Sequence, residues 1–212
     1  MLILFAVGMT LGISFLLSKT LLRGIPSSFV LELPPYRRPK IGDVIVRSVL
    51  DRTIFVLGRA VTVAIPAGVV IWLSQRLELG GHTLLYGLTM LLEPLGETMG
   101  LSGVILAAFL LGIPANEIVL PIILMIYSQS GMLVEAEGIS QAGVILEENG
   151  WTWVTAICVI LFSLNHFPCA TTLLTIRKET GSFFWTGMAF ILPTLAGALL
   201  CVLVNFVTGI FV

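Results

Sequence analysis

Charged side chains are scarce in this sequence: Asp, Glu, Lys and Arg make up 11% of the 212 residues, whereas hydrophobic residues make up 57%. An average soluble domain is about 25% charged. The alternating pattern of about ten residues that marks outer-membrane barrel strands is also missing. Because a spanning backbone must satisfy its own hydrogen bonds, the composition predicts an all-α, polytopic helical membrane protein.

Cysteine is scarce as well, with Cys158, Cys169 and Cys201 all in apolar segments. An odd number in such positions predicts free thiols, and we interpret Cys158 and Cys201 as packing residues. The first apolar run has no basic region before it and no small-residue cleavage site. It therefore reads as a membrane span and not as a cleaved signal peptide.

Prolines and basic residues divide the chain into three parts. Residues 1–23 form a first span, and the Pro-rich residues 24–40 form a cytoplasmic loop. The remaining membrane domain, 41–212, begins with an interfacial helix at 41–59. There Asp43, Arg47 and Asp51 recur every four residues, which gives a polar face with opposite charges one turn apart. Spans and broken helices occupy residues 60–212.

The basic residues also set the topology. Eight of the eleven Lys and Arg residues lie between positions 19 and 59, and two more follow at 177 and 178. The positive-inside bias places both regions in the cytoplasm. The acidic connections at 77–100 and 128–150 then lie outside. This is consistent only if Leu101–Tyr127 turns back as a re-entrant hairpin or the short run before it also crosses; we prefer the hairpin.

The first break in an apolar segment lies around GIPANEIVLP. Glu117 is the only charged residue between Leu101 and Tyr127, and Pro114 and Pro121 interrupt the helical pattern. Each proline frees a backbone carbonyl four residues earlier, and Asn116 adds an amide, so the break predicts a set of cation ligands. A carboxylate in mid-membrane is by default a functional hypothesis. The alternative is a structural pair with an arginine of the interfacial helix.

A second break lies in NHFPCATT, where His166, Cys169, Thr171 and Thr172 surround Pro168. Imidazole and thiolate suit a first-row transition metal better than sodium or magnesium. The alternatives are a satisfied polar histidine and a small buried cysteine. Paired broken helices are the feature with which transporters build sites at the membrane midplane, so the two breaks together predict a transport path.

Several stretches are characteristic beyond their composition: LPPYRRP, RSVLDRTIFVLGRAVTVAIPAGVVIWL, GIPANEIVLPIILMIY, NGWTW and HFPCATTLLTIRKETGS. In this order and spacing, the chain resembles the C-terminal half of the FeoB ferrous iron transport protein family. The resemblance implies a multi-pass protein of the bacterial cytoplasmic membrane in which residues after about 30 form the second gate region. It also implies Fe²⁺ as transported substrate, no tightly bound cofactor, and Glu117, Asn116, His166 and Cys169 along the iron path.

The chain departs from the family pattern in two respects. No G-x-x-x-x-G-K-[ST] loop is present to cradle phosphates, and the first gate region with its cysteine motif is missing. We therefore expect a fragment or a split-gene product that is not an enzyme by itself. Its partners would be Fe²⁺, the lipid bilayer and an N-terminal half with a GTP-binding domain, and not nucleic acid; homo-oligomers are left open.

Three alternatives compete with an iron transporter half. Gate regions also look similar to the nucleoside-recognition segments of nucleoside transporters, so a permease fragment for a nucleoside or another solute is the closest competitor. A non-transporting membrane subunit would use Glu117 only as a structural tie. An intramembrane enzyme with Cys169 as nucleophile and His166 as base is the weakest alternative, because Pro168 disturbs their spacing and no third group orients them.

Overall fold

The computed structural model describes residues 2–20, 42, 46, 53–79, 81–128 and 139–211, and it divides into two units, Met1–Ile54 and Phe55–Val212. In the first unit, α1 (Leu2–Thr20) is an apolar helix of 19 residues. The ammonium of Lys19 lies 4.5 Å from the centre of the Phe15 ring near its end. The expected Pro-rich loop and most of the expected interfacial helix at 41–59 lie outside the described residues.

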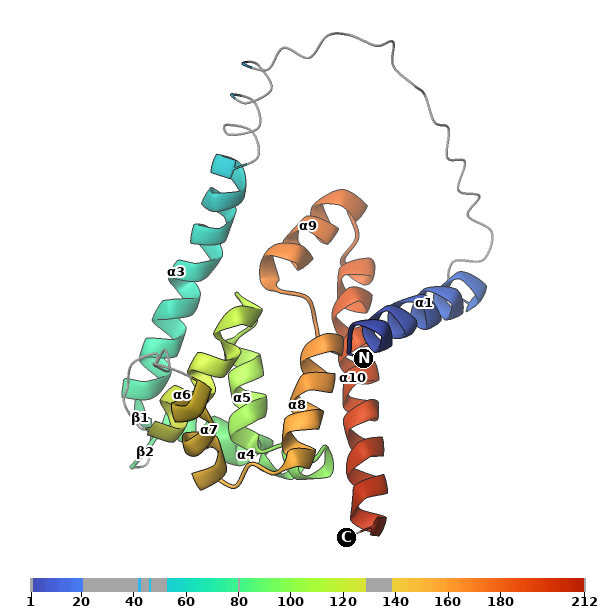
Figure 1. Ribbon diagram of the computed structural model, residues 1–212. Helices are drawn as coiled ribbons and strands as arrows, with labels where there is room; N and C mark the ends of the chain where they lie inside the picture. The colour runs from blue at the N-terminus through green and yellow to red at the C-terminus, as the bar shows by residue number, and fades with distance from the viewer. Residues whose placement is uncertain are drawn as a thin grey trace. The chain divides into compact units, whose positions relative to one another are not determined.

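The second unit is a helical bundle with one very short β-hairpin (Figure 1). Its elements in order are α3 (Phe55–Arg76), β1 (Glu78–Leu79), β2 (His82–Thr83), α4 (Leu84–Thr98), α5 (Gly103–Leu111), η2 (Asn116–Ile118), α6 (Val119–Ser128), α7 (Ile139–Glu148), α8 (Trp153–Asn165), α9 (Ala170–Thr180) and α10 (Phe183–Phe211). The two strands pair antiparallel, with Glu78 opposite Thr83.

Three stretches of the described chain are long and apolar enough to cross a membrane: Val56–Arg76, Trp153–Thr180 and Phe183–Gly209. Large apolar side chains on α10 are exposed, including Leu199 at 70% and Phe206 at 68%. Exposure of this kind suits contact with lipid and not with water. The prediction of an all-α, polytopic membrane protein is confirmed.

The segment Leu101–Tyr127 folds back on itself. The helices α4 and α5 are bent by 114° at the break between them. The Ser102 hydroxyl, at the start of α5, lies 3.3 Å from the Tyr127 hydroxyl, near the end of α6. At the other end, a Cβ added to Gly112 would lie 2.5 Å from a methyl carbon of Val119. Helices α5 and α6 therefore form an antiparallel hairpin (Figure 1), whereas its re-entry into the membrane stays a prediction.

The hairpin packs against α8 and α10 to form the core. The largest fully buried side chains are Ile105, Ile122, Ile123, Cys158 and Cys201. The Cys201 thiol donates to the Cys158 carbonyl at 3.3 Å, and the Cys158 thiol donates to the Cys201 carbonyl at 3.9 Å. Both thiols are free, so their predicted role as packing residues is confirmed.

Polar contacts close the base of the hairpin. A carboxylate oxygen of Glu93 on α4 accepts a 2.8 Å hydrogen bond from the Gly103 N–H, at the start of α5. The amide of Asn205 on α10 donates to the carbonyls of Glu97 and Thr98, at 3.0 and 3.2 Å. These bonds satisfy backbone groups that helix ends leave unpaired, and they fix α4 to both of its neighbours.

Candidate functional site at two helix breaks

The first break separates α5 from α6. Helix α5 ends at Leu111, and α6 begins at Val119 after a 3₁₀ turn. Sequence reasoning expected Pro114 to free the Leu110 carbonyl as a ligand; instead that oxygen accepts from the Ile113 N–H at 3.4 Å. The expected interruption at Pro121 is also wrong, because this residue lies in the first turn of α6, where backbone N–H groups lack helical partners anyway.

The two polar side chains of this break differ in their surroundings. Glu117 is exposed, in the middle of the 3₁₀ turn. The side-chain oxygen of Asn116 is buried and has no hydrogen-bond partner. A buried acceptor without a partner costs about 1–3 kcal/mol, so this oxygen is ready to accept a proton donor or a cation.

The second break separates α8 from α9. Helix α8 ends at Asn165, α9 begins at Ala170, and Pro168 lies in the non-helical residues between them. The Nδ1 atom of His166 lies 2.8 Å from the Ser163 carbonyl oxygen. Because a carbonyl only accepts, Nδ1 carries a proton, and in the neutral ring Nε2 is left with a free lone pair.

This lone pair lies in an aromatic environment. The Nε2 atom of His166 is buried without a hydrogen-bond partner. The imidazole centre is 5.1 Å from the rings of both Phe109 and Phe167, and 6.0 Å from the ring of Phe162. The ring is therefore held in one orientation by packing, with one unpaired acceptor atom.

Cys169 caps the second break at the N-terminus of α9. Its sulfur lies 3.1 Å from the hydroxyl oxygens of both Thr171 and Thr172. In each contact the hydroxyl can donate to the sulfur or the thiol can donate to the hydroxyl oxygen. The supporting role predicted for the two threonines is consistent with this contact, although the site assignment itself stays a prediction.

A backbone hydrogen bond joins the two breaks. The Ala170 N–H donates to the Ile113 carbonyl oxygen at 2.8 Å. Within the described residues, however, no three His, Cys, Asp or Glu side chains come close enough to hold one metal ion. The structure therefore brings the breaks together without assembling a closed metal site from Glu117, His166 and Cys169.

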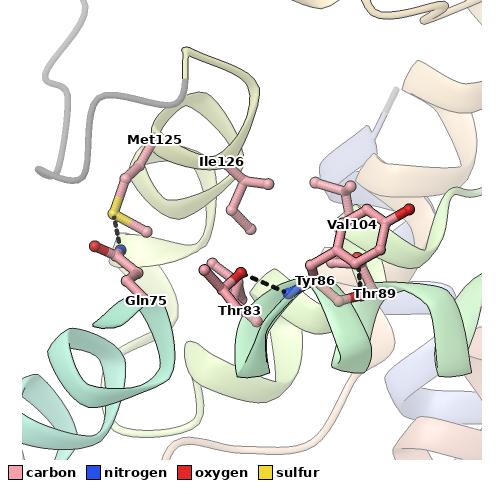
Figure 2. A pocket seen from close by; sticks show the side chains of 8 residues that line it. Gln75, Thr83, Tyr86, Thr89, Val104, Met125 and Ile126 are labelled. Atoms are coloured by element: carbon pink, nitrogen blue, oxygen red, sulfur yellow. Dashed lines mark hydrogen bonds between the residues drawn. The ribbon is translucent and has the colours of Figure 1, made fainter. Parts of the chain in front are cut away.

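Two of the pockets lined by described residues of this unit bear on its function. The first, here the outer pocket, has a volume of about 480 Å³ and is lined by Gln75, Thr83, Leu85, Tyr86, Thr89, Val104, Met125 and Ile126. Figure 2 shows Gln75 and Met125 on one side and Tyr86 with Val104 on the other. The Gln75 amide donates to the Met125 sulfur at 2.8 Å. Sequence reasoning missed this pocket; a polar Gln75 within the last turn of an apolar span was the available signal.

The second pocket, here the threonine pocket, has a volume of about 250 Å³. It lies between α3 and α9, and its lining consists of Val56, Ala60, Thr171, Thr172 and Thr175. Three of these five residues carry hydroxyl groups on one helix. Sequence reasoning identified Thr171 and Thr172 but not Thr175, which lies one helical turn further along.

Two family profiles match the chain. One, described as ferrous iron transport protein B C terminus, matches residues 1–51, and the other, described as nucleoside recognition, matches residues 57–183. A Staphylococcus aureus protein is 29% identical over 211 residues, which cover 94% of this chain and 30% of the relative. A Methanocaldococcus jannaschii protein is 26% identical over 196 residues, covering 84% of this chain and 28% of the relative.

Both relatives are named Fe(2+) transporter FeoB. No solved structure matches the chain. The chain spans less than a third of the length of these relatives. The two profiles follow one another in the order in which the FeoB resemblance predicted a span and then a gate region. The chain belongs to the FeoB ferrous iron transporter family and corresponds to its C-terminal membrane part.

Proposed function

We propose that this chain is the C-terminal part of a ferrous iron transporter of the cytoplasmic membrane and that Fe²⁺ passes along its two joined breaks. The observation that carries the proposal is the 2.8 Å hydrogen bond from Ala170 to Ile113, which holds both breaks at one place. Discontinuous helices at one depth are how many transporters form their substrate sites. Fe²⁺ is the cargo, no cofactor is tightly bound, and the chain by itself catalyses no reaction.

The side chains at the two breaks are suited to weak, transient binding of the ion. Glu117 is exposed and supplies a negative charge that attracts a hydrated cation. Cys169 and the Nε2 atom of His166 then offer sulfur and nitrogen, ligands that favour Fe²⁺ over Mg²⁺ or Ca²⁺. A conducting path must bind its ion weakly enough for release, and ligands met one or two at a time achieve this.

The rest of the transporter supplies the energy and the remaining ligands. The matched relatives are much longer than this chain, which covers 30% and 28% of them. We propose that the partner is an N-terminal half with a GTP-binding domain, associated with this chain within the membrane. The exposed Glu117 then lies at, or near, the surface between the two halves.

Uptake of radioactive Fe²⁺ tests the proposal, in cells from which the native ferrous uptake system has been deleted. The chain is produced alone and with an N-terminal half, and Glu117→Gln and Cys169→Ser are compared with Glu147→Gln and Cys158→Ser. We expect uptake only with both halves, and a loss of about tenfold or more in the first pair of variants but not in the control pair. Unchanged uptake in Glu117→Gln and Cys169→Ser would return both residues to structural roles.

A second candidate function is binding of an uncharged solute such as a nucleoside. The outer pocket favours it, because its lining contains no charged residue and offers the Tyr86 ring for stacking and the Gln75 amide for hydrogen bonds. A profile described as nucleoside recognition covers all eight lining residues. Uptake of radioactive uridine or adenosine that is lost in Gln75→Leu would support this function, and absence of such uptake in the unsubstituted protein would exclude nucleoside transport.

A further inference from the structure

The threonine pocket is built from one polar and one apolar wall. Thr171, Thr172 and Thr175 of α9 form the polar wall, since residues four apart in a helix share a face. Val56 and Ala60, also four apart, form the opposite wall on α3.

The polar wall begins at the second break. Thr171 and Thr172, which line the pocket, also contact the break, because their hydroxyl oxygens lie 3.1 Å from the Cys169 sulfur. The hydroxyl of Thr175 lies further along the wall, where it also donates to the Thr171 carbonyl at 2.9 Å. A cation held at Cys169 therefore meets hydroxyl oxygens next.

The charges of the flanking segments orient the pocket in the membrane. Helix α3 begins within the region 19–59, which holds eight of the eleven Lys and Arg residues, and α9 carries Arg177 and Lys178 in its last turn. The Arg177 guanidinium lies 3.9 Å from the centre of the Phe183 ring, and basic residues at the end of a span extend toward the membrane interface. The positive-inside bias thus places the pocket on the cytoplasmic side of the breaks.

We infer that the threonine pocket is the cytoplasmic station of the ion path, where Fe²⁺ leaves Cys169 and regains oxygen ligands before release between α3 and α9. The inference rests on the proposed function. At about 30 Å³ per water, six waters occupy about 180 Å³. The pocket, at about 250 Å³, has room for a largely hydrated ion. Hydroxyl oxygens replace water ligands without the strong hold of a carboxylate, which favours release.

Ala60 is the residue whose size controls this station. Its methyl group is the smallest side chain of the lining, so Ala60→Leu fills the pocket without removing any polar group. The matched control is Ala64→Leu, the same change one turn along α3 at an exposed position outside the pocket. We expect Fe²⁺ uptake by the chain with its N-terminal half to fall by about tenfold or more in Ala60→Leu and to stay unchanged in Ala64→Leu.

The hydroxyl wall has its own pair of variants. Thr175→Val keeps the shape of the side chain and removes the hydroxyl group. Thr180→Val removes a hydroxyl that donates to a backbone carbonyl one turn earlier in the same way but lies outside the pocket. Uptake should fall in the first variant and not in the second. Equal uptake in both would overturn a role for the hydroxyl wall.

A labelling experiment separates this inference from the proposed transport function. In inside-out vesicles, an introduced thiol in Ala60→Cys is modified by a charged methanethiosulfonate reagent, with and without Co²⁺ as an oxidation-resistant stand-in for Fe²⁺. At ten times its half-saturating concentration, Co²⁺ should slow modification about tenfold, and Ala64→Cys should show no such protection. Modification is read by mass spectrometry at each residue.

The outcomes are distinct. Protection at Ala60→Cys together with loss of uptake in Ala60→Leu supports the station. If the wild-type chain takes up Fe²⁺ and Ala60→Leu takes up as much, the station is overturned, but the proposal of iron transport is not. If the wild-type chain with its N-terminal half takes up no Fe²⁺, the proposed function fails. Protection of Ala60→Cys by Co²⁺ would then still identify an ion-binding pocket. Absence of protection would overturn both the ion-binding pocket and the proposed function.

Discussion

The backbone N–H of Ala170 donates a 2.8 Å hydrogen bond to the carbonyl oxygen of Ile113. One residue opens α9, and the other lies in the turn after α5. In lipid, the unpaired backbone groups of a helix end cost several kcal/mol each unless they find a partner. At this contact each break therefore supplies a hydrogen-bond partner for a backbone group of the other.

Replacing Ala170 with proline tests this relationship. Ala170 is the first helical residue of α9, a position where proline is well tolerated, and Cys169 before it has φ −59° and ψ 157°, which suit a residue preceding proline. Ala170→Pro thus removes the N–H and leaves the Ile113 carbonyl unpaired. We expect the free energy of unfolding to fall by about 1–3 kcal/mol, measured by thermal unfolding in detergent. Ala170→Gly, which keeps the N–H, is the control and should lose clearly less.

Gly103 is a second point at which the hairpin is sensitive. A Cβ at this position would collide with the Thr89 carbonyl and lie 2.6 Å from a carboxylate oxygen of Glu93. We expect Gly103→Ala to destabilise the protein by about 1–3 kcal/mol, because overpacking at the α4–α5 bend must move backbone. Gly87 lies inside α4 with open space around its Cβ position. Gly87→Ala should leave stability unchanged or raise it, and equal losses in both variants would contradict the close packing.

His166→Phe separates a ligand role from a packing role. The imidazole packs against three phenylalanine rings, and its Nε2 atom is buried without a partner. A phenyl ring should fill the space with a stability change below about 1.5 kcal/mol, because the volume is nearly conserved. If Nε2 is an iron ligand, Fe²⁺ uptake should nevertheless fall about tenfold or more. Full uptake in a stable His166→Phe variant would assign the histidine to packing alone.

The three cysteines should differ in reactivity. Cys158 and Cys201 are fully buried, whereas Cys169 is partly exposed and contacts two hydroxyl groups. Thiol reactivity follows exposure and thiolate character. We therefore expect N-ethylmaleimide to modify Cys169 in the folded protein, and Cys158 and Cys201 only after unfolding, as read by mass spectrometry of the peptides. Early modification of Cys158 would show that the α8–α10 contact opens readily.

Sequence patterns predicted best the features that depend only on residues close together in the chain. A long apolar run such as Phe183–Gly209 predicts a span by itself, because transfer into lipid depends on the side chains of that run. Charge counts likewise predicted that either Leu101–Tyr127 turns back or the short run before it crosses, and this choice of membrane topology stays a prediction. The interruption at Pro121 could not be judged in this way, since proline is harmless in the first turn of a helix, and where α6 begins is decided by its packing.

By itself, then, the sequence determined that the chain is a helical membrane protein with two irregular segments, each carrying polar groups that lipid disfavours. Only the tertiary structure decided that these segments meet at Ile113 and Ala170 and that Glu117 stays exposed. It also decided that Thr171, which contacts the Cys169 sulfur, lines a pocket together with residues of α3. The physical reason is that hydropathy is a property of neighbouring residues, whereas hydrogen bonds between breaks and the closure of a pocket join residues far apart in the chain.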